Sequence, residues 1–92
     1  MIACEGTTCR IAGAVTVDSA GSLLRELQPQ LAKGVDRLDF SGVETADSAA
    51  LALVFSAMRQ ARQAGHTLTC TGLPASFVTL AELYGVSELL PA

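Results

Sequence analysis

Two hydrophobic periods alternate along this 92-residue chain, and their order limits the architectures that it can adopt. Apolar and polar residues alternate in Thr8 to Ile11, in Val35 to Phe40 and in Thr67 to Thr71, which is the spacing of β-strands. Between these segments, apolar residues recur every three or four positions, as on a helix that faces a core. Strands that alternate with helices predict an α/β domain with parallel crossover connections.

The predicted helices have recognisable starts and stops. They extend from Asp18 or Ser19 to Gly34, from Ser48 to about Gln63, and over the stretch from Phe77 to Tyr84. Pro29 lies inside the first helix and is expected to kink it or to end it early. Gly65 and Gly85 follow the other two helices at positions where glycine commonly ends a helix.

The remaining segments complete a single domain of residues 1–92. Met1 to Cys4 is expected to pair with the first strand across a turn at Glu5-Gly6-Thr7, and Ser41 to Asp47 is expected to be a polar loop. Leu89 to Pro91 is expected to pack onto the domain as an apolar tail. The prediction is therefore a mixed, mostly parallel sheet of four to five strands packed with three to four helices.

The charge distribution argues against nucleic acid and membranes as direct partners. The six basic residues are scattered and the formal net charge is −3, so no cationic stripe is available for phosphates or anionic lipids. The longest apolar run, Ala49 to Phe55, is too short to span a bilayer, and the first residues lack the pattern of a signal peptide. We therefore expect a cytoplasmic protein without direct membrane insertion.

Neither the cysteines nor the histidine predicts a reactive or metal-binding site. The cysteines, Cys4, Cys9 and Cys70, are odd in number and badly spaced for zinc, so we expect buried thiols in a reducing compartment. His66 lies about 25 Å from Ser48, at the opposite end of the same predicted helix. Phosphate-binding and metal-binding motifs are absent from the sequence. We expect no enzyme activity, no cofactor and no metal.

The junction at Asp47-Ser48 is the most informative part of the sequence. Both residues are favoured N-caps, and capping the helix is a sufficient explanation for them. However, the loops that follow the carboxyl ends of strands are also the usual ligand or partner face of an α/β sheet. Asp47 and Ser48 are therefore candidates for contact with a partner protein.

The helix that follows has an unusually uncharged outer side. Its core side is expected to carry Leu51, Val54, Phe55, Met58 and Arg62. Its other side is expected to carry Ala49, Ala52, Leu53, Ser56 and Gln60. Small, uncharged side chains suit close approach by another protein. For Leu53, contact with a neighbouring helix of its own chain is the alternative.

Several segments together resemble the STAS family, which includes anti-sigma-factor antagonists and the cytoplasmic domains of sulfate transporters. They are Leu38 to Val43, Asp47 to Leu51, the helix up to Gly65, and Thr67 to Thr71. STAS sequences typically carry D-[ST]-x-G-L where Asp47 to Leu51 stand. Asp47 to Leu53 and Phe77 to Tyr84 resemble more closely the MlaB-like STAS subunit of Mla-type phospholipid ABC transporters.

The closer resemblance implies a partner and a role. Such a subunit binds and supports the ATPase of the transporter, peripheral to the inner membrane, in a system that maintains outer-membrane lipid asymmetry, and it does not hydrolyse ATP. The chain has Ser48 where these subunits generally have threonine, and Ala49-Ala50 where they have glycine. Because phosphorylated anti-sigma antagonists use serine there, the resemblance leaves Ser48 as either a contact residue or a phosphorylation site. The alternative partner is an anti-sigma kinase.

Overall fold

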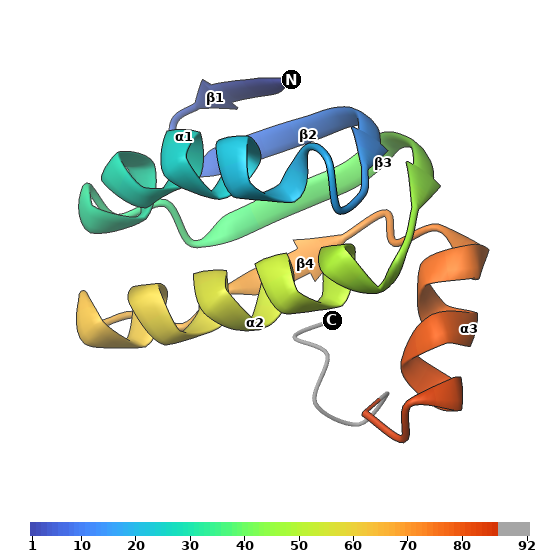
Figure 1. Cartoon of the computed structure of the whole chain (residues 1–92). Helices are drawn as coiled ribbons and strands as arrows, with labels where there is room; N and C mark the ends of the chain where they lie inside the picture. Colours follow the sequence, from blue (N-terminus) through green and yellow to red (C-terminus); the bar gives the residue numbers. More distant parts are fainter. Residues whose placement is uncertain (87–92) are drawn as a thin grey trace.

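The computed structural model describes residues 1–86 of the chain. These residues form a four-stranded sheet and three helices, labelled in Figure 1. In chain order the elements are β1 (Ile2–Glu5), β2 (Thr8–Val15), α1 (Ala20–Ala32), β3 (Arg37–Ala46), α2 (Ser48–Gln63), β4 (Thr69–Thr71) and α3 (Ala75–Leu83). The predicted α/β class and the predicted numbers of strands and helices are confirmed.

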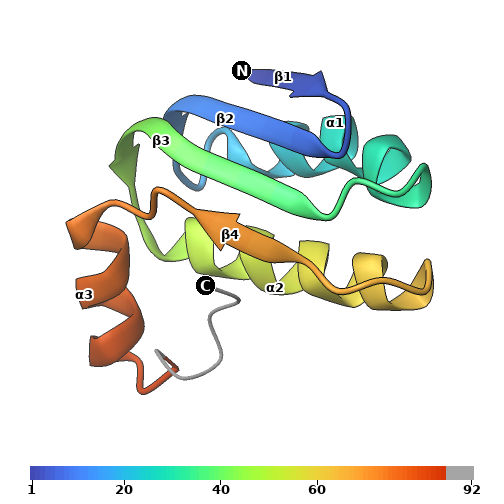
Figure 2. The ribbon, with the colours of Figure 1, turned by 180° about the vertical axis from the view of Figure 1, so that it is seen from behind.

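The order of the strands in the sheet follows their order in the chain, β1-β2-β3-β4. β1 and β2 form an antiparallel hairpin, whereas β3 runs parallel to both β2 and β4. Each parallel pair is joined through a helix, and such crossovers are almost always right-handed. Because both crossovers advance in the same direction across the sheet, α1 and α2 lie on the same face of it (Figures 1 and 2).

The hydrophobic core lies between that face of the sheet and the two helices. Its largest fully buried side chains are Phe40, Phe77, Ile11, Leu27, Leu31, Leu38, Leu53, Val15, Val54 and Cys9. The ring centroid of Phe77 in α3 lies 5.9 Å from that of Phe40 in β3. This aromatic contact is within the range that stabilises a pair of rings, and it attaches α3 to the core.

The opposite face of the sheet is not covered by α1 or α2, as Figure 2 shows. Because strand side chains alternate between faces, this open face carries the polar and small residues Thr8, Arg10, Ala12, Arg37, Asp39, Ser41, Thr69 and Thr71. Asp39 Oδ1 accepts a hydrogen bond from the backbone N of Ser41 at 2.9 Å. Hydrogen bonds from the backbone and side chain of Ser41, with a smaller attraction from Arg10, hold the pKa of the Asp39 carboxyl below its usual value.

The expectation of a polar loop from Ser41 to Asp47 is wrong, because β3 continues as far as Ala46. This second half of β3 pairs with β2, where Ala14 lies opposite Thr45 and Val15 opposite Ala46. The pairing satisfies the hydrogen-bonding groups of the backbone whatever the side chains are. Two register shifts in the ladder accommodate the irregular sequence. Tertiary pairing has therefore overridden the polar composition of the segment.

Pro29 does not end α1 early, since the helix runs on to Ala32. Proline lacks an N–H, but only one helical hydrogen bond is lost at this position near the C-terminus. The carbonyl of Pro29 still accepts a hydrogen bond from the N–H of Lys33 at 3.2 Å. The predicted last helix is confirmed as α3, and the expected tail from Leu89 to Pro91 lies outside the described residues.

The expectation of three buried thiols holds only for Cys70, which is buried and free. Cys4 and Cys9 form a disulfide, and Cys4 is exposed. These residues face each other in the β1-β2 hairpin, with their Cα atoms 4.0 Å apart. The expectation failed because strand register, rather than sequence spacing, brings the two side chains together.

Candidate functional site

The site is built where β3 passes into α2. Asp47 has an extended backbone and is the N-cap of α2, and its Oδ1 accepts a hydrogen bond from the backbone N of Ala49 at 2.8 Å. Ser48 is the first residue of the helix, and it is exposed. Of the two candidate caps, Asp47 is therefore the one that caps the helix, and the hydroxyl of Ser48 is left at the surface.

Asp47 also connects α2 to the loop between β2 and α1. Its Oδ2 accepts a hydrogen bond from the backbone N of Val17 at 3.1 Å. Its own backbone N donates to the carbonyl of Val15 at 3.2 Å. Both carboxylate oxygens are thus occupied within the chain, and the side chain links the starts of two helices.

Ser19 organises the same loop from the other side. Its hydroxyl donates to the carbonyl of Ala14 at 2.8 Å and accepts from the backbone N of Thr16 at 3.0 Å. With Thr16 and Val17 both bonded through their amides, the loop has a defined backbone. Nevertheless, the side chain of Val17 is 76% exposed. An apolar side chain is therefore held in solvent beside the start of α2.

A shallow groove separates the N-terminal halves of α1 and α2. Its volume is about 140 Å³, and it is lined by Ala20, Gly21, Leu24, Ala49, Ala52, Leu53 and Ser56. The structure thus brings together four of the predicted partner-binding residues of α2, and Asp47 and Ser48 lie at the start of the same helix. The contribution of α1 was missed, although the spacing of Gly21, Leu24 and Gln28 marks one helical face that could have indicated it.

Leu53 lies at the bottom of this groove and is only 2% exposed, so the prediction that it lies on the outer face is wrong. The alternative, contact with the neighbouring helix of the same chain, is correct. The buried positions of α2 are Ala50, Leu51, Leu53, Val54, Ala57 and Ala61, whereas Arg62 is exposed. The arc of buried residues on α2 is wider than predicted, and it is rotated about the helix axis relative to the prediction. The reason is that α2 packs against both the sheet and α1.

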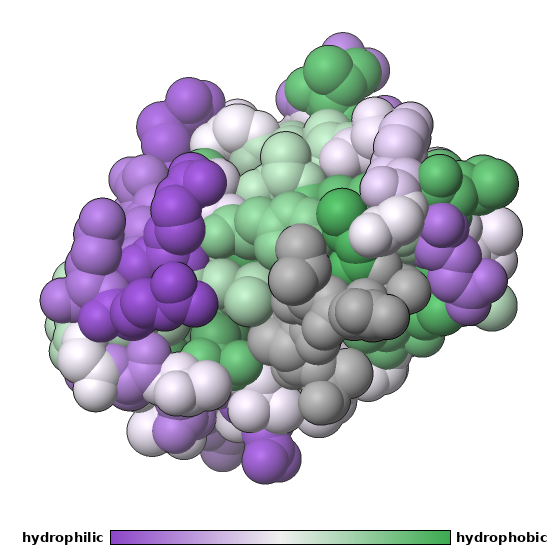
Figure 3. Space-filling view, turned by 90° about the horizontal axis from the view of Figure 1, so that it is seen from below, coloured by the Kyte–Doolittle hydropathy of each residue, from purple (hydrophilic) through white to green (hydrophobic). Residues whose placement is uncertain are grey.

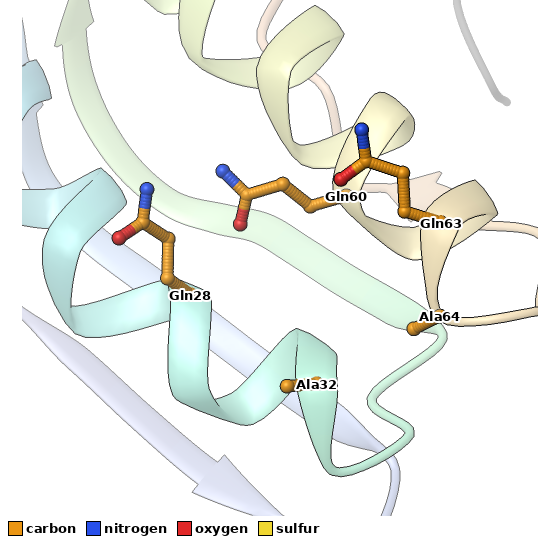
Figure 4. A pocket seen from close by; sticks show the side chains of 5 residues that line it. All are labelled: Gln28, Ala32, Gln60, Gln63 and Ala64. Carbon is orange, nitrogen blue, oxygen red and sulfur yellow. The ribbon is translucent and has the colours of Figure 1, made fainter.

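A second groove continues between the C-terminal halves of the same two helices. It has a volume of about 570 Å³ and is lined by Gln28, Ala32, Gln60, Gln63 and Ala64. Figure 4 shows that Gln28 extends from α1, and Gln60 from α2, into the space between the helices. None of the described residues that line either groove is charged. We call the two grooves together the α1–α2 seam.

Apolar surface is not confined to the seam. In Figure 3, hydrophilic residues concentrate at the end of the molecule where α2 ends, and hydrophobic residues extend from the middle toward α3. Leu83 is 76% exposed and Tyr84 60% exposed at the end of α3. These two residues do not line the seam.

The candidate reactive side chains His66 and Cys70 are both engaged within the fold. His66, at the far end of α2 from Ser48, donates from Nε2 to the carbonyl of Leu31 at 3.0 Å, while its buried Nδ1 has no hydrogen-bond partner. Burial raises the pKa of the Cys70 thiol to about 12, which disfavours the nucleophilic thiolate. Residues 1–86 contain no cluster of His, Cys, Asp and Glu that would hold a metal. No helix among them has the length and hydropathy to cross a membrane.

Comparison with known proteins agrees with the fold. The structure is similar to that of the anti-sigma factor antagonist SpoIIAA in its unphosphorylated form, with a TM-score of 0.74 and 11% sequence identity over 98% of this chain and 84% of that chain. At this identity, the similarity is one of fold. No curated protein sequence matches the chain. A family model described as "Mlab, STAS domain" matches residues 3–91, and the chain therefore belongs to the MlaB-type STAS domain family.

Proposed function

We propose that this protein is a non-catalytic subunit that binds and supports the ATPase of an ABC-type phospholipid transport system of the Mla type. The family assignment supports the transporter partner. In this proposal the protein acts in the cytoplasm, is held at the inner membrane by its partner, and helps to maintain the lipid asymmetry of the outer membrane. STAS domains generally work through protein–protein contact, which needs a surface rather than a catalytic centre.

The observation that carries the proposal is the uncharged α1–α2 seam. Residues 1–86 include fourteen charged residues, yet none of these lines either groove. Charged side chains are depleted at the centres of protein interfaces because their desolvation is costly. Alanine, glycine and serine at the N-terminal half of the seam allow a partner to approach the backbone closely. The glutamines at the other half offer hydrogen bonds without a charge.

Ser48 is proposed to contact the partner at the edge of this surface. It is exposed, and it directly precedes Ala49, which lines the seam. A charge at this position would have to be desolvated in a close interface unless the partner supplied a cation. Ser48→Asp is therefore expected to weaken binding more than it lowers the melting temperature, and Ser48→Ala is expected to have a smaller effect.

The test is titration of the purified chain with the ATPase subunit of the phospholipid transporter from the same organism. Ala52→Arg should reduce affinity by about tenfold or more, because it places a charge on the seam, while leaving the melting temperature nearly unchanged. Thr71→Arg, on the open face of the sheet, is the matched control and should bind like the parent. Unchanged affinity of Ala52→Arg would refute the docking surface. Failure of the parent to bind would refute the partner.

A second candidate is a phosphorylation-regulated antagonist of an anti-sigma kinase. It is favoured by the exposed hydroxyl of Ser48 at the start of α2 and by the similarity of fold to an anti-sigma factor antagonist. Mass spectrometry of the protein from cells distinguishes the two candidates. Phosphate on Ser48, absent from Ser48→Ala and added by a serine kinase of the same organism, would favour the antagonist. Copurification with the ABC ATPase and no phosphate would favour the transporter subunit.

A further inference from the structure

Building on the proposed docking function, we infer that the docking surface extends beyond the α1–α2 seam to the β2–α1 loop, where Val17 inserts into an apolar pocket of the partner protein. Asp47 is the positioning residue that holds Val17 in place for this contact. The partner that fits is a folded protein whose surface has an apolar pocket with a lysine or arginine at its rim.

The first observation is that Val17 is exposed although its backbone is fixed. Its side chain is 76% exposed, while its N–H is bonded to Asp47 and the neighbouring Thr16 N–H is bonded to Ser19. A mobile loop would lose conformational freedom on binding, whereas a pre-organised one loses little. Val17 therefore has the properties of an anchor: an apolar side chain presented at low entropic cost.

The second observation is that the loop and the seam are joined directly. The hydrogen bond between Val17 and Asp47 is 3.1 Å long, and Ala49, two residues after Asp47, lines the seam. On the α1 side, Ala20 and Gly21 line the seam and follow the loop within four residues. A partner that covers the N-terminal half of the seam would therefore meet Val17 at its border.

The charges near Val17 indicate what surrounds the pocket on the partner. Asp18 is exposed directly beside Val17 in sequence. The carboxylate of Asp47, by contrast, is occupied by the amides of Val17 and Ala49. Asp18 thus offers an exposed negative charge at this border, which a basic side chain would complement.

Substitution of Val17 tests the anchor against an equally exposed apolar residue. Val17→Ser should weaken binding to the purified ABC ATPase subunit by about tenfold, because an apolar side chain that becomes buried is lost from the interface. Leu83→Ser is the matched control, since Leu83 is also 76% exposed but lies outside the seam. It should bind like the parent. Both variants should retain the parental melting temperature because they alter exposed side chains.

Asp47→Asn tests the positioning role. An amide has one acceptor oxygen, so it can satisfy the N–H of Ala49 but not that of Val17 as well. Amide hydrogen exchange at Val17 should become faster, and affinity for the ATPase should fall. In a double-mutant cycle, Asp47→Asn should add little to the loss already caused by Val17→Ser, because both act on the same contact.

The outcomes separate this inference from the proposed function. If Val17→Ser binds as tightly as the parent while Ala52→Arg does not, the seam remains the docking surface and the anchor is refuted. If neither variant changes affinity, both proposals are wrong. Fully additive losses from Val17→Ser and Asp47→Asn, or unchanged exchange at Val17, would overturn the positioning role of Asp47.

Discussion

The carboxylate of Asp47 and the backbone amide of Val17 are hydrogen-bonded across 30 residues of sequence. The same carboxylate caps α2 through the amide of Ala49. One side chain therefore both starts a helix and fixes a distant loop. Because its second oxygen holds the loop, Asp47 should contribute more to the free energy of unfolding than a residue that only caps a helix.

Asp47→Ala should destabilise the folded protein. Both hydrogen bonds are lost, and the removal of a helix cap alone costs about 1–2 kcal/mol. Thermal or urea unfolding measures the change. Ser48→Ala is the neighbouring control: the cap hydrogen bond of α2 is made by Asp47 and not by Ser48, so the unfolding free energy of this variant should differ from that of the parent by less than about 0.5 kcal/mol. Equal losses from the two variants would contradict the assignment of Asp47 as the cap.

Leu53 should prove essential to the core rather than to the surface. The side chain of Leu53 is only 2% exposed. Leu53→Ala is therefore expected to cost about 2–5 kcal/mol of unfolding free energy, and Leu53→Asp is expected to prevent folding. Ala52→Asp, one position away and exposed, should fold normally. Circular dichroism with thermal melting distinguishes these cases. A folded Leu53→Asp with parental stability would mean that the side chain is not in the core.

Gly72 is expected to be irreplaceable for steric reasons. Its φ is +67°, and a Cβ built there lies 2.8 Å from the backbone N of Ser41. Gly72→Ala combines a left-handed backbone, which costs about 1–2 kcal/mol for an L-residue, with a backbone clash. Gly65→Ala is the control, because φ is +89° there but nothing lies within 4 Å of the Cβ. Gly72→Ala should lower the unfolding free energy more than Gly65→Ala.

Cys70 should resist alkylation in the native protein. Burial raises the pKa of its thiol to about 12, so the reactive thiolate is scarce at pH 8, and the side chain is 3% exposed. Iodoacetamide at pH 8 should therefore modify it only after denaturation, as measured by mass. The raised pKa also means that this thiol contributes stability below pH 9 that is lost as the pH rises toward 12. Rapid native modification that Cys70→Ser abolishes would contradict the burial.

Most of the helices and strands could be predicted because local patterns of apolar and polar residues determine them. The period of apolar residues distinguished helices from strands, and Ser48 and Gly65 marked the limits of α2. The polar second half of β3 could not be predicted, because its strand conformation comes from pairing with β2 and not from its own side chains. The Cys4–Cys9 disulfide depends in the same way on hairpin register.

For the site, the sequence by itself determined that Asp47 and Ser48 begin a helix with a small, uncharged side. Only the tertiary structure decided which of its residues reach the surface. The packing of α1 against α2 buries Leu53 and leaves Ala52 exposed, and it turns a strip on one helix into a seam between two. The contact between Asp47 and Val17 could not be predicted from the sequence either. Helical periodicity describes one element at a time and contains no information about which element lies beside it.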